Sequence, residues 1–533
     1  MIGRKQRKMG SMLTERIEAQ SDSEAILYVN GVRRVLPDGL APLHPPRISQ
    51  SGKKLGCGEG GCGACTVMIS YLDQNSKNVG MHVITVSCRY GLHPIQESLA
   101  NLHGSQCGFC TPGFIMSIYA LLRSSKRPST EEDIKENFAG NLCQCTGYRP
   151  IIDAFRVFAR IDDALYIIQS SGLSSSEFVC PSTGKPCSFG QDVKDDEGST
   201  KRSICNSGIV KPISYSDTDG AAYTSKEHIF PPELLMRKST ALCLTVSNGL
   251  KWHRPVSLQR VFDIKARYPN AKLVVGNTEV GVETRLKKFH YPVLVHVAHV
   301  PELNKLSIKE EALEIGNIKN LKWFAGIQIR NVASVGGNIC TSSSISDLNP
   351  LWIAAGVKFH ISDCKGNKRI CPAECFFLGY RKIELANNEI LLSIFLPWNS
   401  RYEFVKEFKQ AHRRDADIAI VNAGMRAYLE EKDQKWIVCD ASIVYGGVAP
   451  YSIYANETKK FLLGKHWNKE LFHGSLKVLE KDIILKAEAP GGMVEFRRSL
   501  ILSFFFKFSL WVSHQMDELS CSDGTIPQHF IFP

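Results

Sequence analysis

The stretch "GSQCGFCTPGFIMS", residues 104–117, decides how the N-terminal part of this chain folds. It places a C-x2-C pair just before a proline, and apolar residues at helical spacing follow. A second stretch, "GNLCQCTGYRP" at 140–150, places a C-x-C pair just before another proline. Proline is favoured in the first turn of a helix, so both pairs are predicted to precede a helix. The four cysteines are Cys107, Cys110, Cys143 and Cys145.

Two helix N-termini of this kind suit an anionic metal cluster. The first turn of a helix exposes unpaired N–H groups and the positive end of the helix dipole, which stabilise negative charge. Four thiolates from two such sites can enclose one [2Fe–2S] centre. A structural zinc site is the alternative, although C-x-C is tight for most zinc sites.

A glycine-rich loop lies upstream, in "LGCGEGGCGACTVM" at 55–68. Its spacing C-x4-C-x2-C is that of plant-type [2Fe–2S] ferredoxins, which need a distant fourth cysteine. The intervening glycines permit the unusual dihedral angles that wrapping around a cluster requires. A flexible loop with incidental cysteines and a zinc loop remain the alternatives. The three cysteines of this run are Cys57, Cys62 and Cys65.

Local patterns predict the surrounding elements. Residues 25–39 indicate two strands joined at Asn30-Gly31, and "CTVMIS" indicates another strand. Helices are expected from Pro112, from a capping box of Ser129 with Glu132 up to about Gly140, and from Pro150. The apolar run at 499–513 is short for a bilayer and contains a lysine, which favours a buried helix.

Composition limits the classes of protein that remain. The 533 residues indicate three or four domains, and 44% hydrophobic content is ordinary for globular proteins. The net charge is +12, but no basic stripe is interleaved with aromatics, so nucleic-acid binding is not expected. Neither a secretory signal nor a membrane span is predicted, which favours the cytoplasm. In that reducing compartment the 18 cysteines favour metal or redox chemistry over disulfides.

Two glycine loops in the second half indicate a nucleotide. "AKLVVGNTEVGVE" at 271–283 is an apolar strand that runs into a turn able to present N–H groups to a pyrophosphate. "RNVASVGGNICTSSSISDLNP" at 330–350 adds glycines, hydroxyls and Asp347, whose carboxylate could accept from a ribose or ribityl hydroxyl. Neither loop matches G-x-G-x-x-G. Together, downstream of two iron–sulfur motifs, they favour a flavin.

This order of motifs resembles the N-terminal portion of the molybdenum hydroxylase family of xanthine dehydrogenases and aldehyde oxidases, in its plant type. The resemblance also covers "LYVNGVRRVLPDG" and "FKQAHRRDADIA", and it runs from about residue 25 to 515. It implies a multidomain α+β protein with a β-grasp ferredoxin domain, a helical-bundle [2Fe–2S] domain and a PCMH-type FAD-binding α+β domain with a C-terminal α/β subdomain. The implied bounds are 25–91 for a partly deleted ferredoxin-like domain, 92–169 for the helical domain, 170–228 for a linker, 229–400 for the FAD domain, 401–515 for its C-terminal subdomain and 516–533 for a tail.

The resemblance also implies which residues bind the flavin. The matching positions are Leu273, Val274, Val275, Gly276, Asn277, Thr278, Glu279, Val280, Phe324, Ser334, Gly337, Asn338, Asp347, Leu391 and Lys409. Tyr380 matches a segment that lies near the nicotinamide site in such enzymes.

Three departures from the family pattern stand out. The proline-rich "APLHPPRISQ" replaces a helix after the first hairpin, and the stretch between Val280 and Phe324 is some thirty residues shorter than the pattern. The segment that should carry the fourth cysteine of the first cluster is missing. Cys88 lies 22 residues beyond Cys65 and is the best candidate by spacing, with an empty or three-ligand site as the alternative.

The resulting hypothesis is an oxidoreductase module that passes electrons from one or two [2Fe–2S] centres to FAD and on to NAD or O₂. The family's molybdopterin domain has no counterpart in this sequence, so we expect no molybdopterin binding and no full purine hydroxylation by this chain alone. A separate molybdenum-containing chain and a homodimer are the protein partners that this hypothesis allows. A truncated, non-catalytic remnant is the rival hypothesis, and a zinc-binding scaffold is the third.

Overall fold

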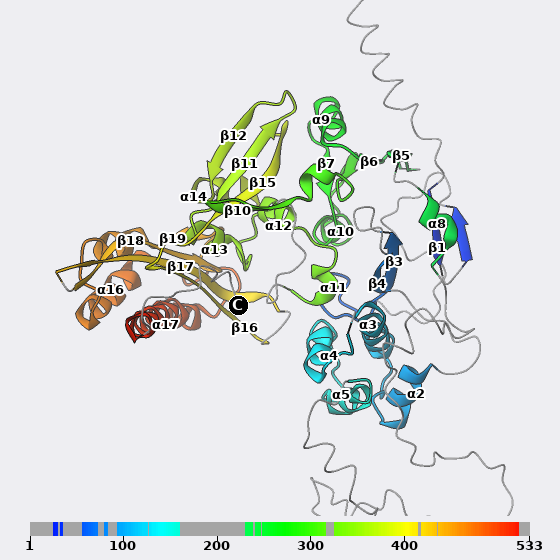
Figure 1. Cartoon of the computed structure of the whole chain (residues 1–533), viewed down its shortest axis with the longest axis horizontal. Helices are drawn as coiled ribbons and strands as arrows, with labels where there is room; N and C mark the ends of the chain where they lie inside the picture. The colour runs from blue at the N-terminus through cyan, green and yellow to red at the C-terminus, as the bar shows by residue number, and fades with distance from the viewer. Residues whose placement is uncertain are drawn as a thin grey trace, which may run out of the picture. The chain divides into compact units, whose positions relative to one another are not determined.

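The computed structural model describes residues 25–29, 32–35, 56–72, 79–83, 93–125, 127–159, 230–237, 240–246, 248–315, 325–413, 417–433 and 435–521 (Figure 1). These fall into two compact units. One comprises 51–56 and 62–235, and the other comprises 1–50, 57–61 and 236–533. The predicted linker 170–228 lies outside the described residues.

Short antiparallel pairs form the strands of the N-terminal region. The two predicted strands are confirmed and pair antiparallel, with Val29 opposite Val32, whereas Asn30 and Gly31 lie outside the described residues. Among the described residues these strands form two separate two-stranded sheets. The sheets pair β1 (Ile26–Val29) with β2 (Val32–Val35), and β3 (Met68–Leu72) with β4 (Val79–Val83).

Helices around an apolar core dominate the unit that contains residues 62–235. Phe114, Ile134 and Phe155 are each at most 1% exposed and pack in one cluster. The helices predicted from the two prolines are confirmed, and an additional helix, α2, precedes them. The bounds are α2 Pro94–Asn101, α3 Thr111–Ser124, α4 Glu131–Phe138 and α5 Arg149–Arg156.

The predicted capping box is wrong by one residue. Thr130, not Ser129, is the N-cap of α4, and its hydroxyl accepts from the Asp133 N–H at 3.1 Å. The Asp133 carboxylate in turn accepts from the Thr130 N–H at 2.8 Å. Ser129 is buried instead, within 3.3 Å of the Ser125 hydroxyl. Both registers of "PSTEED" satisfy the sequence pattern, and packing selects the second.

The second unit begins with a mixed sheet of order β5-β6-β8-β7. Strands β6, β8 and β7 run parallel, which requires crossover connections, and α9 and α10 supply them. The bounds are β5 Leu242–Thr245, β6 Lys251–Arg254, α9 Leu258–Arg267, β7 Lys272–Val274, α10 Val280–Arg285 and β8 Val293–His296, and the short helix α8 Pro232–Met236 precedes them in the chain.

A five-stranded antiparallel sheet of order β12-β11-β15-β10-β9 follows. Phe359 and Ile361 of β11 are fully buried in its core, beside Phe376. The strands are β9 Leu306–Ile308, β10 Ala312–Ile315, β11 Lys358–Asp363, β12 Lys368–Pro372 and β15 Glu389–Pro397, with a small β13 (Phe377–Gly379) and β14 (Lys382–Ile383) pair. The helical elements are η2 Pro301–Leu303, α11 Ile327–Arg330, α12 Val335–Thr341, α13 Asn349–Ala354 and α14 Ala373–Phe376.

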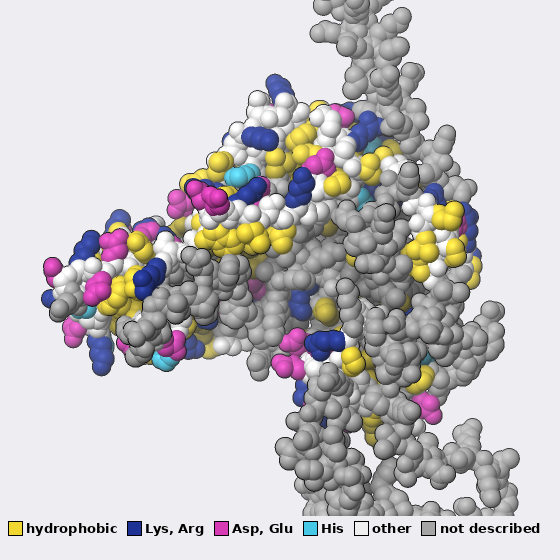
Figure 2. All heavy atoms as spheres, in the orientation of Figure 1, with side chains coloured by type: hydrophobic (Ala, Val, Ile, Leu, Met, Phe, Trp, Pro, Cys, Tyr) yellow, Lys and Arg dark blue, Asp and Glu magenta, His cyan; other side chains and the backbone are white. Residues whose placement is uncertain are grey.

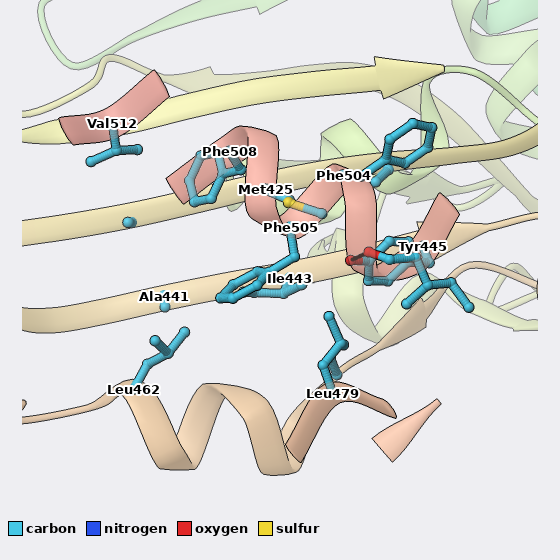
Figure 3. Packing of buried hydrophobic residues seen from close by; sticks show 14 of the residues in the cluster. Met425, Ala441, Ile443, Tyr445, Leu462, Leu479, Phe504, Phe505, Phe508 and Val512 are labelled. Carbon is cyan, nitrogen blue, oxygen red and sulfur yellow. Dashed lines mark hydrogen bonds between the residues drawn. The ribbon is translucent and has the colours of Figure 1, made fainter. Parts of the chain in front are cut away.

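The C-terminal part packs three helices on an antiparallel sheet of order β16-β17-β18-β19. Figure 3 shows Phe505 and Phe508 of the last helix among Met425 and Ile443 of the strands. The buried helix predicted at 499–513 is confirmed. The bounds are β16 Glu403–Ala411, β17 Ala419–Lys432, β18 Lys435–Gly446, β19 Ile453–Tyr454, α15 Asn456–Leu462, α16 Lys469–Asp482 and α17 Val494–Cys521.

The described surface is mixed in charge. On the face drawn in Figure 2, Lys and Arg side chains are interspersed with Asp and Glu and do not form one basic patch. In the part of the chain that the structure describes, no helix combines the length and apolarity that a bilayer crossing requires.

Candidate functional site

The four cysteines of the two helix-associated motifs come together. Cys110 is the N-cap of α3, and Cys143 and Cys145 lie just before α5. The Sγ of Cys145 is 3.5 Å from that of Cys107 and 3.7 Å from that of Cys143. Cys110 and Cys143 share a hydrogen bond between their thiols. We call these four residues the cysteine tetrad.

The thiols of the cysteine tetrad contact one another in series, Cys107 with Cys145, Cys145 with Cys143, and Cys143 with Cys110. Among the described residues, no group of three or more His, Cys, Asp or Glu is arranged to hold one metal ion. A [2Fe–2S] cluster takes two thiolates on each iron, so paired sulfurs are the donor set that it needs. The tetrad therefore fits that cluster.

Hydrogen bonds prepare one thiol of the tetrad to be a thiolate. Burial raises the pKa of the Cys143 thiol, but the hydroxyl and N–H of Thr146, with the Cys110 thiol, outweigh it and bring the pKa to about 7. Burial, followed by the bond to Cys143, raises the pKa of Cys110 to about 12. The Tyr148 hydroxyl accepts from the Cys143 N–H at 3.1 Å. Sequence reasoning missed Thr146 and Tyr148, although both lie within the motif.

The second half of the upstream cysteine loop packs on the helical domain. The Cys62 carbonyl accepts from the Leu142 N–H at 2.9 Å, one residue before Cys143. Gly63 and Gly113 approach so closely that a Cβ on Gly113 would lie 2.2 Å from the Gly63 carbonyl oxygen. Both glycines are therefore needed for close backbone packing.

Asn141 locks this contact. Its amide donates to the Gly63 carbonyl at 3.0 Å, and its side-chain oxygen accepts from the Ser117 hydroxyl at 2.7 Å. Asn141 is only 2% exposed. Sequence reasoning missed Asn141 because its partners lie far away along the chain.

The upstream loop presents three thiols in the described residues. Cys57 is exposed, and Cys62 and Cys65 are half-buried. A side chain at Gly56 would collide with the Cys62 sulfur, because its Cβ would lie 2.6 Å away. The predicted fourth ligand, Cys88, lies outside the described residues.

The first glycine loop folds as predicted, as a strand followed by a tight turn. Strand β7 ends at Val274, and residues 275–279, here called turn A, lead into α10. Asn277 has φ +58°, in the left-handed region. A Cβ on Gly276 would lie 1.9 Å from the Val332 carbonyl oxygen, so only glycine fits there. The predicted contact residues Leu273–Val280 thus lie along one strand and its turn.

The second glycine loop, residues 332–338, is here called turn B. Its backbone touches turn A, because the Val332 carbonyl lies directly beside Gly276. Ser334 is the N-cap of α12, and its hydroxyl accepts from the Gly337 N–H at 3.0 Å. The side-chain oxygen of Asn338 accepts from the Ser346 hydroxyl at 2.7 Å. Three predicted residues of this loop, Ser334, Gly337 and Asn338, therefore lie together.

Asp347 and Lys409 form an ion pair with an N–O distance of 2.6 Å, although 62 residues separate them. Burial raises the pKa of Asp347, and the Lys409 ammonium opposes that rise. Asn422 also interacts with this carboxylate and opposes the rise. The Oδ1 atoms of Asp347 and Asn277 are both buried, and neither makes a hydrogen bond of normal geometry among the described residues. Buried acceptors without partners are rare in proteins and indicate a missing donor.

These features fit a flavin nucleotide. A turn whose Gly276 admits no side chain, with two unpartnered acceptors nearby, suits a ligand that brings phosphates and hydroxyls. Leu391 lies beside turn B, 3.8 Å from a Cβ built on Gly336, and Tyr380 is 57% exposed. Phe324, also predicted to contact the flavin, lies outside the described residues.

Comparison with known families places domains on the same segments. Residues 83–156 match the [2Fe–2S] binding domain, and residues 406–512 match the CO dehydrogenase flavoprotein C-terminal domain. The FAD binding domain in molybdopterin dehydrogenase matches in two pieces, 247–320 and 317–399. The pieces meet inside the interval 280–324, where the sequence predicts a shortened domain.

Individual relatives agree with these domains. Xanthine dehydrogenase 1 of Arabidopsis thaliana is 54% identical over 97% of this chain and 42% of its own length. Xanthine dehydrogenase/oxidase of Gallus gallus is 38% identical over 94% of this chain and 41% of its own length. A solved carbon monoxide dehydrogenase from Hydrogenophaga pseudoflava is 21% identical over 48% of this chain and 93% of its own, with a TM-score of 0.44.

By its domain matches, the chain carries a [2Fe–2S] binding domain and a FAD binding domain of the molybdopterin dehydrogenase class. Within that class, the chain is homologous to the plant xanthine dehydrogenases along nearly its whole length. It spans about 42% of the length of the relatives that it matches.

Proposed function

We propose that this chain is the electron-transfer module of a xanthine dehydrogenase-type enzyme. The [2Fe–2S] centres would supply one-electron transfer, and FAD would supply the exchange of electrons with NAD⁺ or O₂. The cytoplasm is the compartment that this redox chemistry favours. Oxidation of the organic substrate belongs to a molybdenum centre outside the domains matched in this chain, and a dimer is the expected assembly.

One observation carries the proposal: four cysteine sulfurs meet at two helix N-termini, with Sγ–Sγ distances of 3.5 and 3.7 Å. Helix dipoles and N–H groups at these positions favour the negative charge that a cluster and its thiolates bring. Cys107, Cys110, Cys143 and Cys145 are the proposed ligands of one centre. Cys57, Cys62 and Cys65, with Cys88 as the candidate fourth ligand, are proposed for the other.

Residues of the second unit would hold the flavin. Residues of turns A and B would hold the pyrophosphate, and Oδ1 of Asp347 would accept a hydrogen bond from a flavin hydroxyl. Lys409 pairs with the Asp347 carboxylate and opposes the rise in its pKa that burial causes. FAD, when bound, exchanges single electrons with the clusters and a hydride with NAD⁺. Tyr380, exposed beside this site, is the proposed platform for the acceptor.

A visible absorption spectrum with iron and flavin quantitation, on protein purified without air, tests the proposal. We expect about one FAD and two to four irons per chain, the range for one or two clusters. The second candidate, a non-catalytic remnant, is favoured by the interrupted FAD-domain match at 317–320 and predicts no flavin. Colourless, zinc-containing protein would contradict both. NADH-to-dye activity without xanthine turnover is the expected catalytic behaviour.

A further inference from the structure

Arg381 lies on neither glycine turn, yet it contacts elements that follow both. Its guanidinium pairs with Glu279, the last residue of turn A, and with Glu283 on α10, at 2.7 Å for the latter. Its backbone N–H donates to the Ser342 carbonyl at 3.2 Å, at the end of α12. Turn A leads into α10, and turn B leads into α12.

We propose that Arg381 is a positioning residue that holds turns A and B in the geometry that binds the flavin. The inference rests on the proposed function. Arg381 is not proposed to contact the flavin. Its guanidinium acts by pairing with two carboxylates, Glu279 at the end of turn A and Glu283 on α10.

The first turn of α10 needs stabilising contacts from outside the helix. Glu279 is its N-cap, but the side chain makes no capping hydrogen bond, and the helix has only six residues. A helix of that length is not stable by itself, so tertiary contacts must fix its first turn. Arg381 supplies two contacts one helical turn apart, at Glu279 and Glu283.

The Glu283 end of the ion pair with Arg381 is buried. The Glu283 side chain is 5% exposed, and its other near partner is the Tyr291 hydroxyl at 2.7 Å. Lys272 is 3.9 Å away, at the limit of an ion pair. A buried carboxylate needs charge compensation, and the two-pronged geometry of a guanidinium suits two acceptors better than an ammonium does.

Arg381 and Ser342, which share a backbone hydrogen bond, both have strained backbone conformations. Arg381 has φ +56°, and Ser342, which it contacts, has φ +48°. Non-glycine residues rarely adopt the left-handed region unless their surroundings impose it. The Ser342 hydroxyl donates to the Gly379 carbonyl at 3.2 Å, which docks the segment before Arg381 onto α12.

Arg369 provides a matched control. It also brackets two carboxylates, Glu384 at 2.5 Å and Glu389 at 2.6 Å, and it is similarly exposed, at 36% against 25% for Arg381. Both of its partners lie outside turns A and B. Loss of Arg369 therefore removes an equivalent bracket without touching the turns.

The test is an FAD titration of the deflavinated full chain, with flavin fluorescence and the flavin midpoint potential as readouts. We expect Arg381→Gln to raise the Kd for FAD by about 10- to 100-fold, the usual cost of removing a supporting contact. Arg369→Gln should stay within about twofold, typical of a remote surface change. Arg381→Lys, which keeps the charge without the fork, should recover only part of the affinity.

The double variant Arg381→Gln/Glu283→Gln separates positioning from folding, because it leaves no uncompensated buried charge. We expect it to melt close to the wild-type temperature while its FAD affinity stays weak. Wild-type affinity in the double variant, or equal affinity in Arg381→Gln and Arg369→Gln, would overturn the inference. A wild-type chain that binds no FAD at all would instead overturn the proposed function.

Discussion

The cysteine tetrad and the flavin turns are built in opposite ways. The tetrad uses cysteines within 40 residues of one another, each pair set just before a helix that begins with proline. The flavin turns depend on residues brought from far away, such as Lys409, 62 residues from Asp347, and Arg381, 102 residues from Glu279. A local site can be recognised in a sequence, whereas a site held by remote partners shows only its central motif.

The largest expected effect breaks the tetrad itself. Cys110→Ala should remove one complete centre, about two irons per chain, because a [2Fe–2S] cluster needs all four thiolates. FAD content should not change, since the flavin residues lie in the other unit. Iron analysis and absorption spectra would check this, with exposed Cys375→Ser as the control. Unchanged iron in Cys110→Ala would contradict the ligand assignment.

The second prediction concerns Asn141→Ala. Asn141 is bonded to Gly63, which is remote in sequence, although the cysteines of the same unit lie close together along the chain. Its loss leaves the Gly63 carbonyl and the Ser117 hydroxyl buried without their partner. We expect the free energy of unfolding of this unit to fall by about 3 kcal/mol. Chemical denaturation would measure it, with Asn387→Ala, at an exposed amide pair, as the control. Equal stability of the two variants would show that the hydrogen bonds of Asn141 do not stabilise this unit.

These two regions also differ in what the sequence could predict. The tetrad and its two helices were foreseeable because cysteine, proline and apolar spacing all lie within one short window. Asn141 was not foreseeable, since its partner Gly63 is 78 residues away. The capping box was misplaced because Ser129 and Thr130 offer the same pattern, and only packing distinguishes them. Turn A was recognised by its glycines, but nothing in the sequence links it to Arg381.

Acidity should affect the flavin unit through His296, a half-buried residue that contacts turn A. Its ring stacks on Trp252 and makes a backbone hydrogen bond at Val275. Burial, reinforced by His299, lowers the pKa of His296 to about 4. Between pH 6.5 and 4 the unfolded chain therefore binds more protons at this residue, so stability falls as the pH drops through that window.

We expect His296→Phe to lose less stability than wild type between pH 7 and 4.5, by about 2 kcal/mol. Phenylalanine keeps the stacked ring and removes the proton site. Urea unfolding at the two pH values would measure the difference, and exposed His473→Gln should behave as wild type. Parallel pH profiles for His296→Phe and wild type would contradict the prediction.

The smallest expected effect concerns the remote ion pair. Asp347→Asn should weaken FAD binding about tenfold, because an amide is a poorer acceptor than a charged carboxylate for a flavin hydroxyl. FAD titration would measure it. Glu457→Gln, which breaks the exposed pair with Lys460, should leave the affinity unchanged. Tenfold weakening in both variants would point to a general loss of stability and not to the site.

An anaerobic titration with NADH, followed by visible absorption, tests the central claim that FAD and the cysteine tetrad exchange electrons within this chain. The account predicts that the flavin band bleaches and that the iron–sulfur bands then bleach in the same protein. Bleaching of the flavin with the iron–sulfur bands left fully oxidised, although dithionite reduces them, would contradict it.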